Sequence, residues 1–316
     1  MLGVLGDLVE DVVVWVAGPL RHGTDSTARV FRQRGGSAAN VAAFAAGQCP
    51  VRFLGCVGDD PAGGGLAAEL AGHGVDVRVA HRGRTGSIVV LIDDAGERTM
   101  LPDRGAATLL ETVPDAWLDG LTHLHVPAYS FDGEPVGTTA VDALRRVRST
   151  GGTTSLDASS TGMLEGFGRE RFLALAEELA PTLLFANRSE SAYLGLLVDG
   201  RPGPERARLA ATTVVTKSGA EATTVDVPGA APFTVPVPPV GEVRDLTGAG
   251  DAFAAGFLAA FLDARLTVAE PGAPGAPGAP GTQGAPGAPA LREAAARGHR
   301  CAARVLASPG ASCAED

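Results

Sequence analysis

Short apolar runs alternate with helix-forming stretches along most of this chain, and that order limits the folds it can adopt. The apolar runs have the length of strands; in chain order they are VLGDLV, VRFLGCVG, LTHLHVPA, GTTSLDA, PTLLFAN and TTVVTKSG. Stretches rich in Ala, Leu, Glu and Arg, such as residues 140–150 and 171–180, lie between them. This alternation is typical of βαβ units on a largely parallel sheet. We therefore predict an α/β fold whose ligands bind beyond the carboxyl ends of the strands.

A glycine-rich turn directly before an apolar helical stretch predicts a phosphate site. Residues 245–253 read DLTGAGDAF and run into AAGFLAAFL. Gly248 and Gly250 leave room for an anion to approach backbone N–H groups, and the first turn of a helix has unsatisfied donors and partial positive charge. Asp251 would stand where an attacking hydroxyl must lose its proton. The same carboxylate could instead cap the helix.

Composition and charge narrow the range of partners. The net charge is −10, the pI is near 5.1, and the basic residues are scattered, which argues against a nucleic-acid surface and for a small ligand. The four cysteines show no C-x-x-C pairing, so neither a disulfide framework nor a zinc site is indicated. No uninterrupted apolar run reaches the roughly eighteen residues of a membrane span, and the apolar N-terminus carries acidic residues, so we expect a strand there and a cytoplasmic protein.

The length of 316 residues favours one main domain, which we expect to cover residues 1–316. Two segments, residues 11–36 and 86–106, are rich in β-forming residues without an intervening helix and predict a small separate β-sheet. Residues 271–289 repeat glycine at every third position, too few times for a collagen triple helix, and predict a disordered Gly/Ala/Pro insert.

Five motifs in a fixed order support one family. They are RGGSAANVAAF at 34–44, VGDDPAGG at 57–64, NRSE at 187–190, VVTKSGAEA at 214–222 and DLTGAGDAF at 245–253. Together they resemble the PfkB, or ribokinase-like, family of carbohydrate and nucleoside kinases, over nearly the whole chain. The resemblance implies a three-layer α/β/α sandwich with a mostly parallel central sheet, and a small β-sheet lid. It also implies ATP-dependent phosphorylation of a hydroxymethyl group on a sugar or sugar-like molecule.

The resemblance implies roles for the nucleotide-side motifs. Asp251 is expected to be the general base, with an anion hole formed by Gly248, Ala249, Gly250 and Asp251 itself. The nucleotide is expected to lie along Asn187, Thr216, Gly219, Gly248 and Gly250, with a turn at 307–312 over its base. Glu190 is expected to hold Mg²⁺ through water, although a solvated first-turn helix residue is the alternative. Asp245 and Thr247 mark the place for a K⁺ ion, and Asp157 is a second-tier candidate. Lys217 is expected to face solvent, with a phosphate contact as the alternative.

The acceptor side follows from the N-terminal motifs. The resemblance implies that Asp11 binds the sugar, that Gly35 and Gly36 form the hinge of the lid, and that Asn40 bonds sugar hydroxyls. Asp7 ranks below Asp11 and would be a strand-end turn residue. Arg104 could reach an acidic or phosphorylated substrate.

The lid implies a homodimer, and an exposed apolar face around Val12, Val14 and Val16 would explain it. A monomer whose lid covers itself is the alternative. A nucleoside kinase and a non-catalytic sugar or nucleotide sensor are the competing functions, although Trp15 and Phe31 as the lid's two aromatics favour a plain sugar. A dehydrogenase is disfavoured because no strand-linked G-x-G-x-x-G opens the chain.

Overall fold

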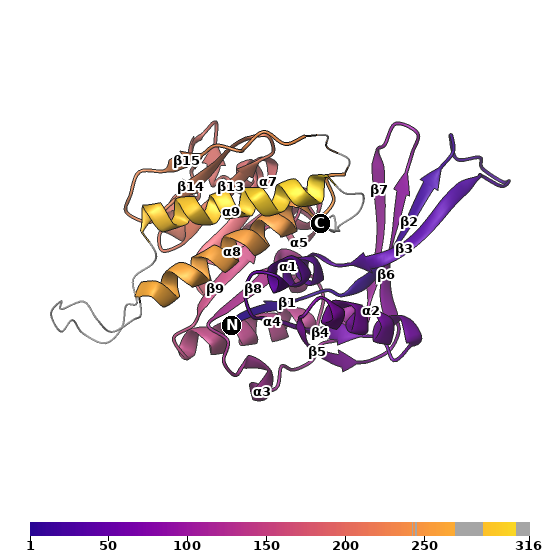
Figure 1. The fold of residues 1–316 in the computed structure, drawn as a ribbon, viewed down its shortest axis with the longest axis horizontal. Helices are drawn as coiled ribbons and strands as arrows, with labels where there is room; N and C mark the ends of the chain where they lie inside the picture. Colours follow the sequence, from indigo (N-terminus) through magenta and orange to yellow (C-terminus); the bar gives the residue numbers. More distant parts are fainter. Residues whose placement is uncertain (242, 244, 269–286, 308–316) are drawn as a thin grey trace. The chain divides into compact units, whose positions relative to one another are not determined.

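The computed structural model describes residues 1–241, 243, 245–268 and 287–307, which form two compact units (Figure 1). The first unit contains Met1 and residues 3–152, and the second contains Leu2 and the described residues from 153 onward. Most of the predicted Gly/Ala/Pro insert lies outside the described residues. Its predicted end at residue 289 is wrong, because helix α9 already begins at Ala288. The turn predicted at 307–312 lies outside them from residue 308 onward.

The first unit contains four strands in the order β8-β1-β4-β5. Their bounds are Leu2–Leu5 (β1), Val51–Val57 (β4), Asp76–His81 (β5) and His123–Pro127 (β8). Every residue of β1, β4 and β8 is buried, which explains why these strands read as unbroken apolar runs. The helices of this unit are α1 (Ser37–Ala46), α2 (Pro61–Gly72), α3 (Asp115–Leu118) and α4 (Val136–Ser149), with short 3₁₀ turns at Ala106–Thr108 and Ala128–Phe131.

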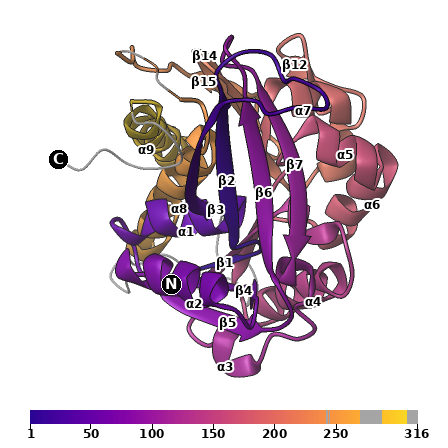
Figure 2. The same cartoon turned by 90° about the vertical axis from the view of Figure 1, so that its right-hand side faces the viewer.

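A separate four-stranded sheet also belongs to the first unit, with the order β3-β2-β6-β7 (Figure 2). It consists of β2 (Val9–Val16), β3 (Ala28–Gly35), β6 (Thr85–Ile92) and β7 (Arg98–Gly105). β2 runs parallel to β6, and the other two pairings are antiparallel. The two segments that the sequence assigned to a small sheet therefore do form one.

The second unit contains the strand order β15-β14-β13-β10-β9. The bounds are Thr153–Asp157 (β9), Leu183–Asn187 (β10), Thr213–Ser218 (β13), Glu221–Asp226 (β14) and Phe233–Val235 (β15). β9, β10 and β13 are parallel, whereas β14 and β15 are antiparallel additions. Its other elements are α5 (Thr161–Phe167), α6 (Arg169–Leu179), α7 (Arg188–Leu194), the two-residue strands β11 (Leu197–Val198) and β12 (Arg201–Pro202), and a 3₁₀ turn at Arg206–Leu209.

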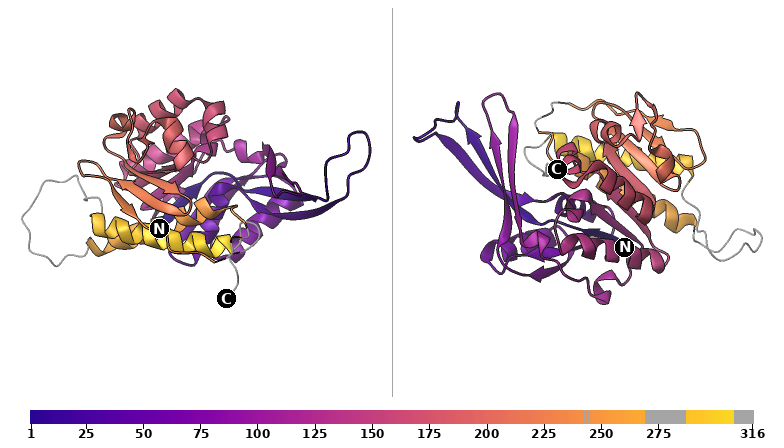
Figure 3. Two further views of the ribbon diagram at one scale, coloured as in Figure 1. Left: turned by 90° about the horizontal axis from the view of Figure 1, so that it is seen from above. Right: turned by 180° about the vertical axis from the view of Figure 1, so that it is seen from behind.

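Two long helices of the second unit, α8 (Ala249–Val268) and α9 (Ala288–Leu306), pack side by side (Figures 1 and 3). Glycines permit the close approach. A Cβ on Gly256 would lie 2.7 Å from the Arg297 carbonyl oxygen, and one on Gly298 would lie 2.8 Å from the Phe253 ring. Helix α8 also packs on the sheet, where the rings of Phe257 and Phe185 meet edge to face at 5.2 Å. Because α8 packs against both α9 and the sheet, its first turn has a fixed position in the second unit.

Candidate active site

Three polar side chains lie at the carboxyl ends of the parallel strands in the second unit. Asp157 is the last residue of β9, Asn187 is the last residue of β10, and Lys217 is the penultimate residue of β13. The register pairs Asn187 with Lys217 and Asp157 with Phe185, so β10 and β13 end close to one level and β9 ends two residues earlier at the same edge of the sheet. This edge is where open α/β sheets bind ligands.

Lys217 is largely buried, so the expectation that it faces solvent is wrong. Its side chain is 15% exposed, and Nζ donates to Oδ2 of Asp157 at 2.8 Å. The same Nζ lies 3.4 Å from the position that a Cβ on Gly250 would occupy, which places the ammonium beside the backbone at the start of α8. Burial acts to lower the pKa of Lys217, but the negative charges of Asp157, Glu190 and Asp251 outweigh it, and the pKa is raised overall. Lys217 is therefore a charged ammonium.

Glu190 forms a capping box with Asn187 at the start of α7. The Glu190 backbone N–H donates to the Asn187 Oδ1 at 2.9 Å, and the Asn187 backbone N–H donates to the Glu190 Oε2 at 2.7 Å. Glu190 is 2% exposed. Burial, reinforced by the charge of Asp157, raises the pKa of Glu190 to about 7 against opposing contributions from Lys217 and the Asn187 N–H. The alternative of a solvated first-turn residue is wrong for this carboxylate.

The predicted glycine-rich turn lies directly before α8. Gly248 has φ +75°, a left-handed conformation that glycine adopts without strain, and α8 begins at the next residue. The Ala249 N–H donates to the Leu246 carbonyl at 3.3 Å, and the Asp245 carboxylate accepts from the Thr247 N–H at 2.7 Å. Gly250 and Asp251 follow in the first turn of the helix, where backbone N–H groups have no acceptor within the helix.

The two β13 residues predicted along the nucleotide differ in their surroundings. Thr216 is 1% exposed, and its hydroxyl lies 3.1 Å from that of Ser191 on α7. Gly219 follows β13 with φ +61° in the tight turn to β14, which again favours glycine. Thr216 therefore joins β13 to α7 inside the second unit, and Gly219 shapes the turn after Lys217.

The predicted acceptor residues gather in the first unit around the junction of β3 and α1. Asp11 is 6% exposed, and a Cβ on Gly35 would lie 2.0 Å from its Oδ1, so this carboxylate rests against a residue without a side chain. Gly36 caps α1 with φ +101°, and a Cβ on it would lie 2.2 Å from the Asp7 carbonyl oxygen. Asn40, 6% exposed, accepts a hydrogen bond from the Arg34 guanidinium through its Oδ1 at 2.8 Å.

Arg104 forms a two-point ion pair with Asp7 in the first unit. Its Nε and Nη2 lie 2.7 and 2.8 Å from the two oxygens of the Asp7 carboxylate, and Nη1 donates to the Asp132 carbonyl. The two side chains are 14% and 9% exposed. Asp7, which the sequence analysis ranked as a strand-end turn residue, is therefore a buried partner of Arg104. No local motif indicated this pairing, because 97 positions separate the two residues.

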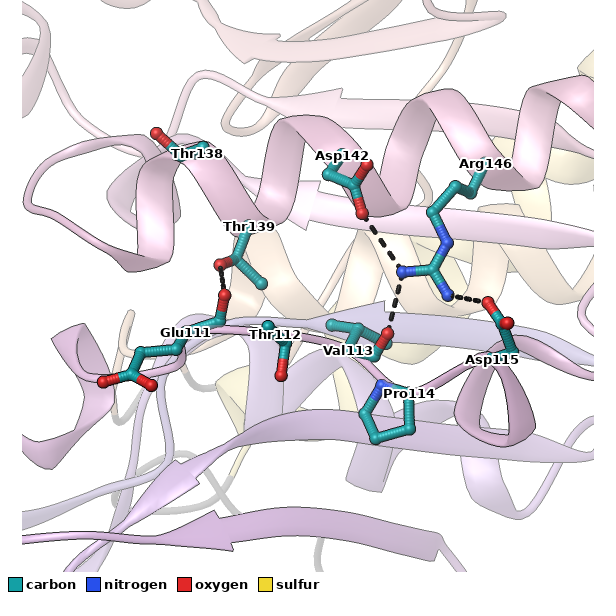
Figure 4. Close-up of a pocket in the computed structure, with 9 residues that line it drawn as sticks. All are labelled: Glu111, Thr112, Val113, Pro114, Asp115, Thr138, Thr139, Asp142 and Arg146. Atoms are coloured by element: carbon teal, nitrogen blue, oxygen red, sulfur yellow. Dashed lines mark hydrogen bonds and ion pairs between the residues drawn. The ribbon is translucent and has the colours of Figure 1, made fainter.

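One cavity of about 540 Å³ lies in the first unit away from these residues (Figure 4). Arg146 crosses it, bonding Asp142 Oδ2 at 3.1 Å, the Val113 carbonyl at 2.7 Å, and Asp115. The Thr139 hydroxyl donates to the Glu111 carbonyl at 2.8 Å. None of the predicted site residues lines it, and the groups named here are engaged with one another, so we assign it no ligand.

Metal binding by protein ligands alone finds no support in the part of the chain that the structure describes. No cluster there contains three or more His, Cys, Asp or Glu side chains able to hold a metal ion. Mg²⁺ usually keeps several of its waters, so a single buried carboxylate such as Glu190 fits a water-mediated site. Among the same residues, no helix is long and apolar enough to cross a membrane.

Sequence comparisons find relatives of this chain among carbohydrate kinases. The family model for the pfkB family carbohydrate kinases matches residues 4–316. An ATP-dependent ribose-1-phosphate kinase from Halopiger xanaduensis is 32% identical over 255 residues, covering 75% of this chain and 77% of the relative. A fructokinase from Klebsiella pneumoniae is 32% identical over 278 residues, covering 81% and 82%.

Solved structures share the fold. Adenosine kinase from Sinorhizobium meliloti superposes with a TM-score of 0.79 at 22% identity, covering 99% of this chain and 96% of that one. A putative ribokinase II from E. coli, solved in complex with ATP and Mg²⁺, gives a TM-score of 0.74 at 20% identity, covering 98% and 94%. The predicted α/β fold is confirmed as ribokinase-like, with a mostly parallel nine-strand central sheet and a small four-strand sheet.

Proposed function

Because the chain belongs to the pfkB family of carbohydrate kinases, we propose that it transfers the terminal phosphoryl group of ATP to a hydroxymethyl group of a sugar, with Asp251 as general base. The observation that carries this proposal is the glycine-rich turn at the start of buried helix α8, next to the ammonium of Lys217. Backbone N–H groups at a helix start favour anions, and Asp251 in that first turn supplies the carboxylate.

In the proposed reaction, the acceptor hydroxyl gives its proton to the Asp251 carboxylate while its oxygen bonds to the γ-phosphorus. The bond from that phosphorus to the β–γ bridging oxygen breaks, and ADP leaves. The N–H groups of Gly250 and Asp251 stabilise charge on the transferred group, with Gly248 and Ala249 shaping the turn. Asn187, Thr216 and Gly219 belong to the nucleotide side of the site.

Mg²⁺ would supply charge neutralisation for the triphosphate, held through water by Glu190. The cap keeps Asn187 and Glu190 in fixed geometry, with the Asn187 Nδ2 donating to the Glu190 Oε1 at 2.5 Å. K⁺ is a further proposal, placed at the turn where the Asp245 carboxylate accepts from the Thr247 N–H. Replacing KCl by choline chloride at constant ionic strength tests it, since a K⁺ site requires a fall in kcat.

The acceptor is proposed to be a neutral sugar bound by Asp11 and Asn40, with the Gly35–Gly36 hinge below the lid. A carboxylate and an amide suit hydroxyl groups. Arg104 is bound at two points by Asp7, which neutralises its charge and favours an uncharged sugar over a sugar phosphate. A nucleoside acceptor is the second candidate, because solved structures of the same fold include adenosine and aminoimidazole riboside kinases.

The test is acceptor-dependent ADP formation from MgATP with fructose, ribose, ribose 1-phosphate and adenosine. Turnover with a neutral sugar supports the proposal, and turnover with adenosine alone supports the nucleoside reading. Tight acceptor binding without ADP formation for any of them would mean that the protein is a sensor.

A homodimer through the four-stranded sheet is also proposed. Between β2 and β3, Val13 pairs with Phe31, and the next pair along the strands is Val14 with Val30. Successive side chains of a strand point to opposite faces, so the sheet carries apolar residues on both faces. Phe31 and Val30 are 52% and 58% exposed in the single chain. Burying such residues favours self-association. Val30→Asp should convert a dimer into a monomer in sedimentation equilibrium, and a wild-type chain that sediments as a monomer would contradict the proposal.

A further inference from the structure

Lysine occurs once in this chain. Of its 26 basic residues other than histidine, 25 are arginines and the remaining one is Lys217. Arginine supplies the cation of other buried ion pairs, such as that of Arg206 with Asp226, whereas Lys217 pairs with Asp157. A compact ammonium differs from guanidinium because it is a point charge with three donors that can turn toward different acceptors.

The surroundings of Lys217 suggest what the point charge serves. One donor goes to Asp157 at 2.8 Å, and Nζ lies 3.4 Å from the Cβ position of Gly250 in the first turn of α8. The ammonium therefore stands beside the backbone N–H groups proposed to hold the transferred phosphoryl group. Asp157 fixes it there from the end of β9, and two further carboxylates, Glu190 and Asp251, contribute to its electrostatic environment.

The positive charge of Lys217 offsets negative charge that gathers at this position. Asp157, Glu190 and Asp251 are acidic groups close enough to act on Lys217, and a nucleotide triphosphate adds more negative charge. Backbone dipoles alone supply about half a positive charge at a helix start. A full ammonium at the same turn would lower the repulsion that both the nucleotide and the Asp251 carboxylate experience.

We infer that Lys217 is a catalytic residue of the proposed kinase reaction, whose ammonium binds the phosphoryl group being transferred while Asp157 holds it in position. That Lys217 acts in catalysis rests on the proposed function, whereas its binding of an anionic group rests on geometry alone. Asp157 is then a positioning residue. This role explains why a carboxylate that accepts a hydrogen bond from Lys217 stands at the end of β9.

The single lysine permits a direct test on the wild-type chain. Protein labelled with [ε-¹³C]lysine should give one lysine ¹H–¹³C cross-peak, from Lys217. Saturating ATP without metal should shift that peak strongly, ADP should shift it less, and AMP should leave it within a tenth of the ATP shift. A peak unmoved by ATP, at a concentration that calorimetry shows to be saturating, overturns the inference whether or not any sugar is phosphorylated.

Kinetics provide the second arm. Lys217→Met should lower kcat at least a hundredfold with little change in the KM of the acceptor, and Lys217→Arg should recover part of the loss because the charge returns. A Lys217→Met enzyme that melts like the wild type and keeps kcat within threefold overturns the inference while leaving the kinase proposal intact. Absence of turnover in the wild type would instead reject the kinase proposal, and the cross-peak would still decide whether Lys217 binds phosphate.

Discussion

The proposed chemistry of the second unit depends on a few charged side chains held at strand ends. Lys217 and Asp157 are 60 positions apart in the chain, yet their side chains meet because β9, β10 and β13 run parallel, in that order, and end at the same edge of the sheet. Sequence motifs indicated Asn187, Glu190 and Asp251 as candidates because each lies in a short local pattern. The Lys217–Asp157 pair has no such pattern, and the signal that could have indicated it is that Lys217 is the sole lysine among 25 arginines.

Glu190 should make stability depend on pH. Its pKa is raised from 4.5 to about 7 in the folded chain, chiefly by burial. Between these values the unfolded chain has released the proton while the folded chain keeps it, so stability falls as pH rises through that window. At about 1.4 kcal/mol per pKa unit, the loss between pH 5 and pH 8 should be on the order of 2–3 kcal/mol, because the unfolded chain has already released most of the proton at pH 5.

Urea unfolding at pH 5 and pH 8 measures this loss. Glu190→Gln should flatten the dependence while preserving the capping box, because glutamine can accept the same backbone hydrogen bond. Glu165→Gln, at an exposed position of α5, is the matched control and should leave the dependence unchanged. An unaltered pH dependence in Glu190→Gln would show that this carboxylate is not the cause.

Gly35→Ala should weaken acceptor binding. The added Cβ would lie 2.0 Å from Oδ1 and 2.3 Å from Cγ of Asp11, so the carboxylate would have to move. We expect the KM of the acceptor to rise about tenfold, equivalent to about 1.4 kcal/mol, with the KM of ATP unchanged. Gly65→Ala on α2 meets no atom within 4 Å and serves as the control in initial-rate kinetics. An unchanged acceptor KM in Gly35→Ala would argue against a sugar site at Asp11.

Among the elements, the sequence predicts the buried strands well, because local hydrophobicity determines where they lie. The runs that became β1, β4, β8, β9, β10 and β13 were recognisable because strands buried on both faces need continuous apolar residues. The start of α9 was not, because the repetitive composition of 271–289 continues into the helix and Ala288 and Pro289 fit both. Proline at the first helical positions costs no hydrogen bond, so the helix can begin inside the repeat.

The contact between α8 and α9 gives a prediction about stability. Gly256→Ala would place a Cβ 2.7 Å from both the Arg297 carbonyl and the Cys301 Sγ, so the helices must separate, at about 1–3 kcal/mol. Gly166→Ala on α5 meets no atom within 4 Å and should be neutral or stabilise by up to about 1 kcal/mol. Thermal unfolding compares the two. Equal Tm values would mean that α8 is not held by this contact.

For the molecule as a whole, the order of five motifs indicated the family that the family model and the curated relatives then confirmed. Acceptor identity did not follow, because it depends on pairings across the chain. Arg104 illustrates this: alone it suggested an acidic substrate, but the fold gives it Asp7 as a partner 97 positions away. Spacing in sequence cannot reveal which of 25 arginines is neutralised in this way.

The most direct test of the account is the rate of phosphoryl transfer by Asp251→Asn, measured as acceptor-dependent ADP formation at saturating MgATP with the sugar that the wild type uses best. Asp263→Asn, on the same helix and paired with Arg297 at its surface, is the matched control. General-base catalysis contributes about two to four decades, so kcat should fall by about 10²–10⁴ in Asp251→Asn alone, with both KM values and the Tm near those of the wild type. A kcat for Asp251→Asn within threefold of the wild type would contradict the assignment of the base and of the site built around it.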